Sequence, residues 1–224
     1  MYVPWFTKPE TEKRVLQIVN LSPDESWIEE IVSDSSAYWT LFGQQVLMTK
    51  LKFPDLTRML DSEDIPSFLK PYLKFLGLGI PSNLDAWDGY PSDRSKLYSL
   101  MQKANKQFVS LAGDTHNSWV SELENVDGKK IGIELGAPSV TSPGITDVLK
   151  LNEGEFTNSI IKMNKELKWM DPSHRGFLTL DISKEFILAK FYYIKELEEI
   201  NPEIEFSRSF KIYNEGSSLS VKES

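Results

Sequence analysis

The feature that most constrains the fold of this chain is a helical pattern that leads directly into a buried strand. Apolar side chains stand at Leu97, Leu100, Met101 and Ala104, a spacing of i, i+3, i+4 and i+7 that predicts an amphipathic helix. Residues 107–113 follow at once as a short apolar run ending in glycine, which is typical of a strand buried in a layered protein. A helix followed by such a strand predicts the α/β fold class.

The other elements are predicted from shorter patterns. Ser92 is the expected N-cap of the helix just described, and Ser22 is the expected N-cap of an amphipathic helix over residues 22–32. Residues 53–83 contain four prolines and predict a loop-rich excursion, whereas the polar residues 216–224 predict a disordered tail. A helix is predicted over residues 152–165, and strands are predicted over residues 37–52, 119–123, 130–135, 177–182, 189–194 and 209–213.

The composition excludes several classes of function. The 33 acidic and 25 basic residues give a net charge of −8, which argues against unspecific binding to nucleic acid or to anionic lipid. Since the chain has no Cys, it has no disulfide framework, thiolate zinc site or cysteine nucleophile. No apolar run approaches about 18 residues, so we expect no membrane span. Residues 1–9 lack the pattern of a secretory signal.

The residues best suited to carry chemistry follow the predicted strand at 107–113. The run Gly113-Asp114-Thr115-His116 places a carboxylate and an imidazole two residues apart, beyond the carboxyl end of that strand. Ligands collect at this end of the strands in open α/β sheets, and mixed oxygen and nitrogen ligands suit a transition or hard metal ion. The sequence therefore suggests a metal site at Asp114 and His116, although the same pattern also occurs in turns that hold no metal.

Other polar residues have more than one open role. Asp85 and Asp88 lie in one turn, where they either face one ion or bond the backbone. Glu134 lies inside a predicted strand and needs a partner, which is either Arg175 or a metal. His174 lies in a polar turn and is interpreted as a surface residue, with a substrate contact as the alternative.

Five segments, taken in order, resemble one family: the PhoD-like alkaline phosphatases and phosphodiesterases of the metallophosphoesterase group. The resemblance extends over most of residues 22–213, and it rests on the order of the segments rather than on any one of them. The segments are Gly43-Gln44-Gln45 within residues 38–48, Asp85-Ala86-Trp87-Asp88-Gly89-Tyr90-Pro91 ahead of Arg94, Gly113-Asp114-Thr115-His116 within residues 111–119, Gly136-Ala137-Pro138-Ser139 within residues 133–144, and His174-Arg175-Gly176 within residues 164–181.

The resemblance implies a metallophosphoesterase-type β-sandwich flanked by helices, with a cluster of metal ions at the sheet ends that hydrolyses phosphate esters. In this family the expected ions are Ca²⁺ and Fe³⁺. By the same resemblance Asp114 and His116 are metal ligands, Asp88 is a further site residue that binds metal, and Arg175 binds the phosphate-ester substrate.

The chain departs from the family pattern in ways that predict an incomplete metal centre. The early motifs of the family, an Asp, a Gly-Asp and a Gly-Asn-His block, are missing, and Glu166 stands where a His is expected after Asn164. We therefore expect residues 1–215 to be the C-terminal portion of such a domain, with its first sheet missing. The alternative to an incomplete hydrolase is a non-catalytic half that a partner chain or missing N-terminal half completes. A binding protein with a vestigial site is a third possibility.

Overall fold

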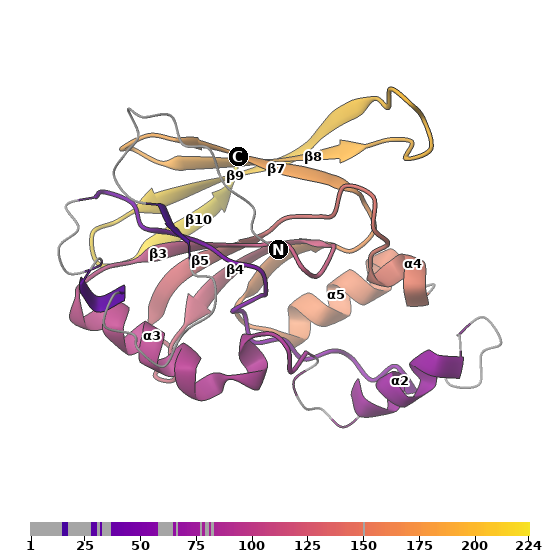
Figure 1. Cartoon of the computed structure of the whole chain (residues 1–224), viewed down its shortest axis with the longest axis horizontal. Helices are drawn as coiled ribbons and strands as arrows, with labels where there is room; N and C mark the ends of the chain where they lie inside the picture. Colours follow the sequence, from indigo (N-terminus) through magenta and orange to yellow (C-terminus); the bar gives the residue numbers. More distant parts are fainter. Residues whose placement is uncertain are drawn as a thin grey trace.

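Two β-sheets packed face to face form the centre of the molecule (Figure 1). The computed structural model describes residues 15–17, 28–30, 32, 37–57, 65, 67–76, 78, 81, 83–149 and 151–224. Helices cover the face of the larger sheet that points away from the smaller one, so the described residues form three layers: helices, large sheet and small sheet.

The larger sheet carries the strand that leads into the predicted metal site. Its neighbouring strands β1, β2, β3 and β5 are parallel, whereas β4 runs antiparallel to both β5 and β6. Parallel strands end at the same edge of a sheet, so the carboxyl ends of β2 and β3 lie side by side. In spatial order the strands are β1 (Val15–Gln17), β2 (Leu41–Gly43), β3 (Phe108–Ala112), β5 (Lys130–Gly136), β4 (Ser118–Glu124) and β6 (Leu167–Asp171).

The smaller sheet is antiparallel and buries one of its faces against the larger one. Alternate residues of β8, from Ile187 to Tyr193, are buried and pack on Val109, Val120 and Ile133 of the larger sheet. This period of two is what a half-buried strand requires. In spatial order the strands are β10 (Leu219–Glu223), β9 (Ile204–Asn214), β8 (Ile187–Ile194) and β7 (Gly176–Ile182).

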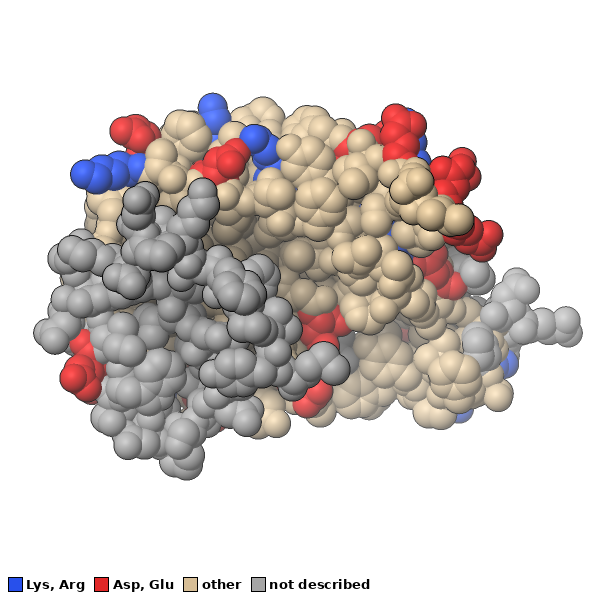
Figure 2. All heavy atoms as spheres, turned by 45° about the horizontal axis from the view of Figure 1, so that its top comes forward, with Lys and Arg blue, Asp and Glu red and all other residues tan. Residues whose placement is uncertain are grey.

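The opposite face of the smaller sheet carries a row of aromatic side chains. Phe177 stacks on Tyr192, with ring centroids 5.3 Å apart, and Tyr192 meets the edge of Phe206 at 5.9 Å. In Figure 2, which brings the top of Figure 1 forward, charged side chains gather at the two ends of the upper surface, with uncharged residues between them. Cross-strand aromatic pairs of this kind stabilise neighbouring strands.

The helices attach to the larger sheet through apolar faces. Leu97 and Met101 of α3 pack against Phe108, and Phe156 and Ile160 of α5 pack in a cluster with strands β3, β4 and β6. The side chain of Asn152 caps α5 by accepting a hydrogen bond from the Glu155 amide at 3.0 Å. The helices are α2 (Lys70–Leu76), α3 (Pro91–Lys103), α4 (Ile145–Leu149) and α5 (Glu153–Met163), with single turns of 3₁₀ helix at η3 (Ser67–Leu69) and η4 (Trp87–Gly89).

The α/β prediction is confirmed, and so are most of its elements. Helices α3 and α5 and the strands β3, β4, β5, β7, β8 and β9 lie where the sequence predicts them. In the amphipathic helix predicted over 22–32, residues 28–30 and 32 are helical, and the buried Ile28 and Val32 lie on its apolar face. The rest of that segment lies outside the described residues. The described residues form two packed sheets, and the expectation that a first sheet of the domain is missing stays a prediction.

Two local predictions are wrong. Ser92 is not the N-cap of α3, because Pro91 already occupies the first turn and Tyr90 stands at the cap. Proline at the first helical position presets the backbone angle φ, so it takes the place of a side-chain cap. The strand predicted over residues 37–52, with an interruption at residues 43–45, is much shorter than expected: only Leu41–Gly43 pairs with β3, and the residues after Gly43 do not resume a strand.

The disordered tail predicted for residues 216–224 is also wrong. Residues 219–223 form β10, which pairs antiparallel with β9 in the register Leu219↔Asn214 to Glu223↔Phe210. Leu219 is buried in the core between the sheets, and Val221 packs against the same cluster. Two apolar residues at a spacing of two are enough to anchor an edge strand once a partner strand is present.

Among the helices that the structure describes, none has the length and apolar character needed to cross a membrane. This agrees with the absence of a long apolar run in the sequence.

The buried position of Leu219 gives a direct test of β10. Leu219→Ala should lower the free energy of unfolding by about 2–5 kcal/mol, because it leaves a cavity in the core between the sheets. The exposed Glu223→Ala in the same strand should change it by less than about 0.5 kcal/mol. Urea denaturation of both variants measures the difference, and equal stability of the two would contradict the edge strand.

Candidate functional site

The predicted Asp114 turn lies at the carboxyl end of β3, where two backbone groups hold it against the end of β2. The amides of Gly113 and Asp114 both donate hydrogen bonds to the carbonyl oxygen of Gln45, at 3.0 and 3.1 Å. The side chain of Asp114 is exposed, and within the described part of the chain no group donates a hydrogen bond to its carboxylate. Its oxygens are therefore open to a ligand.

His116 is held in an unusual backbone conformation in the same turn. Its φ angle is 60°, in the left-handed region that few residues other than glycine adopt. Its Nδ1 lies 3.2 Å from the carbonyl oxygen of Pro143, which fixes the ring if Nδ1 carries the proton. That tautomer leaves Nε2 as a metal ligand, and a histidine that binds metal usually donates its other ring N–H to a carbonyl or carboxylate.

Arg175 fastens this turn to the neighbouring loop. One guanidinium nitrogen donates to the carbonyl oxygens of His116 and His174, at 3.1 and 2.8 Å, and the other pairs with Asp147. Only 3% of the Arg175 side chain is exposed. The guanidinium is thus occupied by hydrogen bonds and an ion pair within the protein. Its contact with substrate stays a prediction.

Asp88 does not lie free beside Asp114. One oxygen of its buried carboxylate forms a 2.7 Å ion pair with Arg94, and the other accepts a hydrogen bond from the Leu51 amide at 2.9 Å. Of the two roles that the sequence left open, these bonds favour the backbone role. Among the described residues, the group of three acidic and histidine side chains whose ligand atoms all lie within 4.8 Å of one another does not include Asp88, Asp114 or His116. A ligand role for Asp88 remains a prediction.

The buried carboxylate of Glu134 explains why residues 44–49 lie where they do. One oxygen accepts from the Met48 amide at 2.8 Å and from the Ser110 hydroxyl at 3.1 Å; the other accepts from the amide and hydroxyl of Thr49, at 2.8 and 2.6 Å. Burial raises the pKa of Glu134, and these hydrogen bonds oppose the rise. The partners of Glu134 are therefore backbone amides, hydroxyl groups and the Gln44 side-chain amide rather than Arg175.

The next three amides along the chain are bound by side chains as well. Glu166 accepts from the Lys50 amide at 3.2 Å, Asp88 accepts from Leu51, and Asn164 accepts from the Lys52 amide at 2.7 Å. An irregular segment that is partly buried needs such partners, because unpaired amides are costly away from water. Sequence reasoning missed this role of Glu166 and Asn164, since their partners lie more than 100 positions away in the sequence.

A cleft of about 290 Å³ opens beside the Asp114 turn. Its walls come from the irregular segment after β2, from α2, from α4 and from the turn between β3 and β4. Asp88 and Asp114 both line it, so the structure brings these two predicted residues to one cavity. Aliphatic and aromatic side chains form most of the remaining wall.

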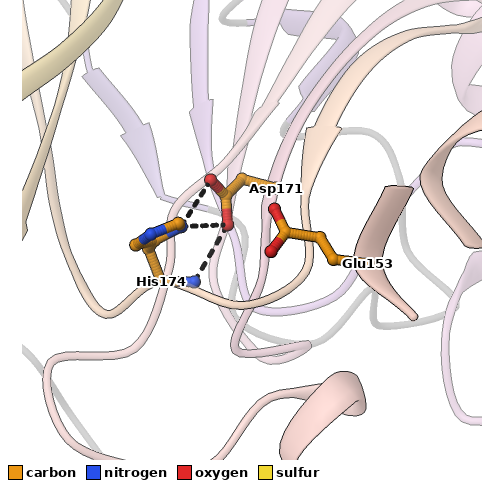
Figure 3. A group of neighbouring side chains, drawn as sticks. All are labelled: Glu153, Asp171 and His174. Atoms are coloured by element: carbon orange, nitrogen blue, oxygen red, sulfur yellow. Dashed lines mark hydrogen bonds and ion pairs between the residues drawn. The ribbon is translucent and has the colours of Figure 1, made fainter. Parts of the chain in front are cut away.

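A second polar group, which sequence reasoning did not predict, lies at the start of α5. Ligand atoms of Glu153, Asp171 and His174 all lie within 4.8 Å of one another, and Figure 3 shows the Glu153 carboxylate beside the Asp171–His174 pair. Nδ1 of His174 lies 2.9 Å from Asp171, and its ring stacks on Tyr193 at 4.8 Å. The spacing Asp171-x-x-His174 was visible in the sequence, but Glu153 carried no signal.

The pKa values of the Asp171–His174 pair shift in opposite directions. The hydrogen bond to Asp171 raises the pKa of His174 above 6.5, and partial burial of the ring works against this. Burial disfavours ionisation of Asp171, but the hydrogen bonds from His174 and Ser173 outweigh it and lower the pKa of Asp171. The two residues thus form an ion pair at mildly acidic pH.

The comparisons with known proteins agree with the order of motifs. A family model described as PhoD-like phosphatase matches residues 22–191. The chain belongs to the PhoD-like phosphatase family. Alkaline phosphatase D of Bacillus subtilis (strain 168), a curated relative, is 25% identical over 164 residues, which are 71% of this chain and 24% of that protein. The chain therefore spans about a quarter of the length of this PhoD-like relative.

A solved structure described as the structure of PhoD has the same fold. It aligns with a TM-score of 0.67 and 20% sequence identity, over 92% of this chain and 35% of its own. This likeness confirms the metallophosphoesterase-type β-sandwich that the motifs implied. It concerns the fold alone.

The Asp171–His174 pair predicts a specific titration. In proton NMR, His174 should titrate at a pKa above 6.5 in the wild type and at a lower pH in Asp171→Asn. Because the pKa of Asp171 is lower in the folded chain than in the unfolded chain, this residue contributes stability above about pH 4. That contribution is lost as the pH falls below this value. Because the pKa of His174 is higher in the folded chain than in the unfolded chain, this residue contributes stability below about pH 6.5. That contribution is lost as the pH rises through the pKa of His174 in the folded chain.

The pair should therefore stabilise the fold most between about pH 4 and 6.5, and by less than about 1 kcal/mol because His174 is half exposed. An unchanged His174 titration in Asp171→Asn would contradict the pairing.

Proposed function

We propose that this chain is part of a metal-dependent phosphoester hydrolase, a PhoD-like alkaline phosphatase, and that the isolated chain is incomplete as an enzyme. The observation that carries the proposal is the position of Asp114 and His116. In a chain of this family they lie in one turn at the carboxyl end of a parallel strand, and the Asp114 carboxylate is open to solvent. A phosphate ester is the proposed substrate.

Asp114 and His116 are the proposed metal ligands, and Ca²⁺ and Fe³⁺ are the proposed ions. The donor set fits, because carboxylate oxygens suit Ca²⁺ and a carboxylate with an imidazole suits iron. The Nδ1 contact of His116 with Pro143 leaves Nε2 for the metal. When bound, such ions supply an activated water and positive charge around the phosphate oxygens.

The other residues of the chain would orient this turn. The Gln45 carbonyl and the Arg175 guanidinium hold it from its two sides, through Asp114 and His116 respectively. For Arg175 we propose that any contact with substrate follows loss of its Asp147 ion pair, since its guanidinium is otherwise occupied. Asp88 is the least supported ligand, because both its oxygens already have partners.

The small number of proposed metal ligands supports the proposal that the isolated chain is an incomplete enzyme. Two ligands rarely hold a catalytic ion, and the group's early motifs are missing from this sequence. We propose that residues 1–215 together with β10 are the C-terminal portion of the domain, and that an N-terminal half or a partner chain supplies the remaining ligands. The alternative, a non-catalytic half, is favoured by the ion pair and the backbone hydrogen bond that already occupy the two oxygens of Asp88.

Metal titration with matched histidine variants tests the ligand assignment. Calorimetric titration with Ca²⁺ and with Fe³⁺ should detect weak binding to the wild-type chain, and Asp114→Asn and His116→Ala should each weaken it by at least about tenfold. His174→Ala replaces the only other histidine of the chain and serves as the control. Hydrolysis of a chromogenic phosphate ester by the lone chain should be slow or absent.

Two results would contradict parts of this proposal. If His174→Ala abolishes metal binding and His116→Ala does not, the metal binds at the Glu153 group and the ligand assignment is wrong. If the lone chain holds stoichiometric metal and turns over rapidly, the claim of incompleteness is wrong.

A further inference from the structure

The cleft beside Asp114 is lined by a few polar residues and a larger number of apolar ones. The polar residues include the exposed Asp114 and the neighbouring Thr115. The apolar residues come from elements far apart in the sequence and include Phe53, Leu69, Ile145 and Val148. A cavity that is mostly apolar with a few convergent polar groups is the usual form of a small-molecule site.

The apolar walls are part of the fold rather than a gap between loose segments. Leu69 and Ile145 of the wall pack against a buried cluster that includes Leu73 and joins α2 to α4. Phe53 packs on Phe156 of α5, with ring centroids 5.8 Å apart. The walls are therefore supported from behind, as a binding surface requires.

The polar groups of the cleft leave one carboxylate open for chemistry. Asp88 lines the cleft but is engaged by Arg94 and the Leu51 amide. Asp114 has no such partner in the described residues. A ligand that spans the cleft thus meets one open carboxylate, a few neutral polar groups such as those of Asn83 and Asn117, and a mostly apolar surface.

We infer that this cleft binds the alcohol portion of the substrate, and that this portion is a small apolar group, an aryl or short alkyl chain. The inference rests on the proposed function, because it places the phosphate at the Asp114 turn. At about 290 Å³ the cleft lies at the small end of ligand pockets, which suits one aromatic ring or a short chain. In the reaction, water oxygen bonds to phosphorus, the ester P–O bond breaks, and the alcohol leaves with a proton.

Binding of the released alcohol tests this without any turnover. Trp119 lines the cleft, and its indole N–H donates to the hydroxyl of Thr115 at 2.6 Å, so its NMR signal reports on this cavity. In the metal-free chain, benzyl alcohol should shift the Trp119 indole signal saturably with a Kd on the order of millimolar, and glycerol should not. The indole of Trp39, which donates to the Ser183 carbonyl, should stay unchanged.

Val148 offers matched variants. It lines the cleft and is 37% exposed, so Val148→Asp changes the wall at little cost to the core. We expect it to weaken benzyl alcohol binding by at least about tenfold, and the nearly isosteric Val148→Thr to weaken it about threefold. Val126→Asp makes the same change at a residue that is 85% exposed and outside the cleft, and should leave the affinity within about twofold.

The outcomes separate this inference from the proposed function. If metal binding depends on Asp114 but benzyl alcohol does not shift Trp119, or binds Val148→Asp as well as it binds wild type, the apolar substrate assignment is overturned while the function stands. If benzyl alcohol binds as described but no metal binding depends on Asp114, the cleft is an apolar pocket without phosphate chemistry. The substrate assignment then falls together with the proposed function.

Discussion

The buried carboxylate of Glu134 is the interaction on which the rest of the candidate site depends. It is fully buried and accepts hydrogen bonds from the Met48 and Thr49 amides and from the Ser110 hydroxyl. A buried carboxylate is tolerated only when its oxygens are hydrogen-bonded, and the backbone amides are tolerated only when they find an acceptor. Each therefore requires the other, and together they fix an irregular segment against the larger sheet.

The turn that carries Asp114 and His116 is positioned by that segment. The carbonyl of Gln45 lies just before the part that Glu134 holds, and it accepts the amides of Gly113 and Asp114. From the other side, the buried Arg175 binds the carbonyl of His116. A ligand turn held at both ends is pre-organised, which lowers the cost of binding an ion or a phosphate there. The same segment forms one wall of the apolar cleft, so metal site and cleft share a support.

The sequence predicts the parts of this arrangement that depend on local pattern. Helix α3 and strand β3 followed from apolar spacing, and the Asp114 turn followed from its place after that strand. The side-chain acceptors of residues 48–52 were not predictable, because Glu166 and Asn164 lie far away in the sequence and carry no periodic signal. Strand β10 was missed for a related reason: its polar composition resembles a tail, and only pairing with β9 reveals that Leu219 is buried.

Hydrogen exchange in Glu134→Gln tests most directly whether the buried carboxylate positions the metal turn. The side-chain nitrogen of glutamine cannot accept a hydrogen bond, so one of the Met48 and Thr49 amides should lose its acceptor and its protection. If Glu134 positions the metal turn, the Gly113 and Asp114 amides, which donate to the Gln45 carbonyl, should exchange at least about tenfold faster in the same variant. Amides of β8 should keep their exchange rates. Unchanged protection at Gly113 and Asp114, with protection lost at Met48 or Thr49, would contradict this positioning role of Glu134.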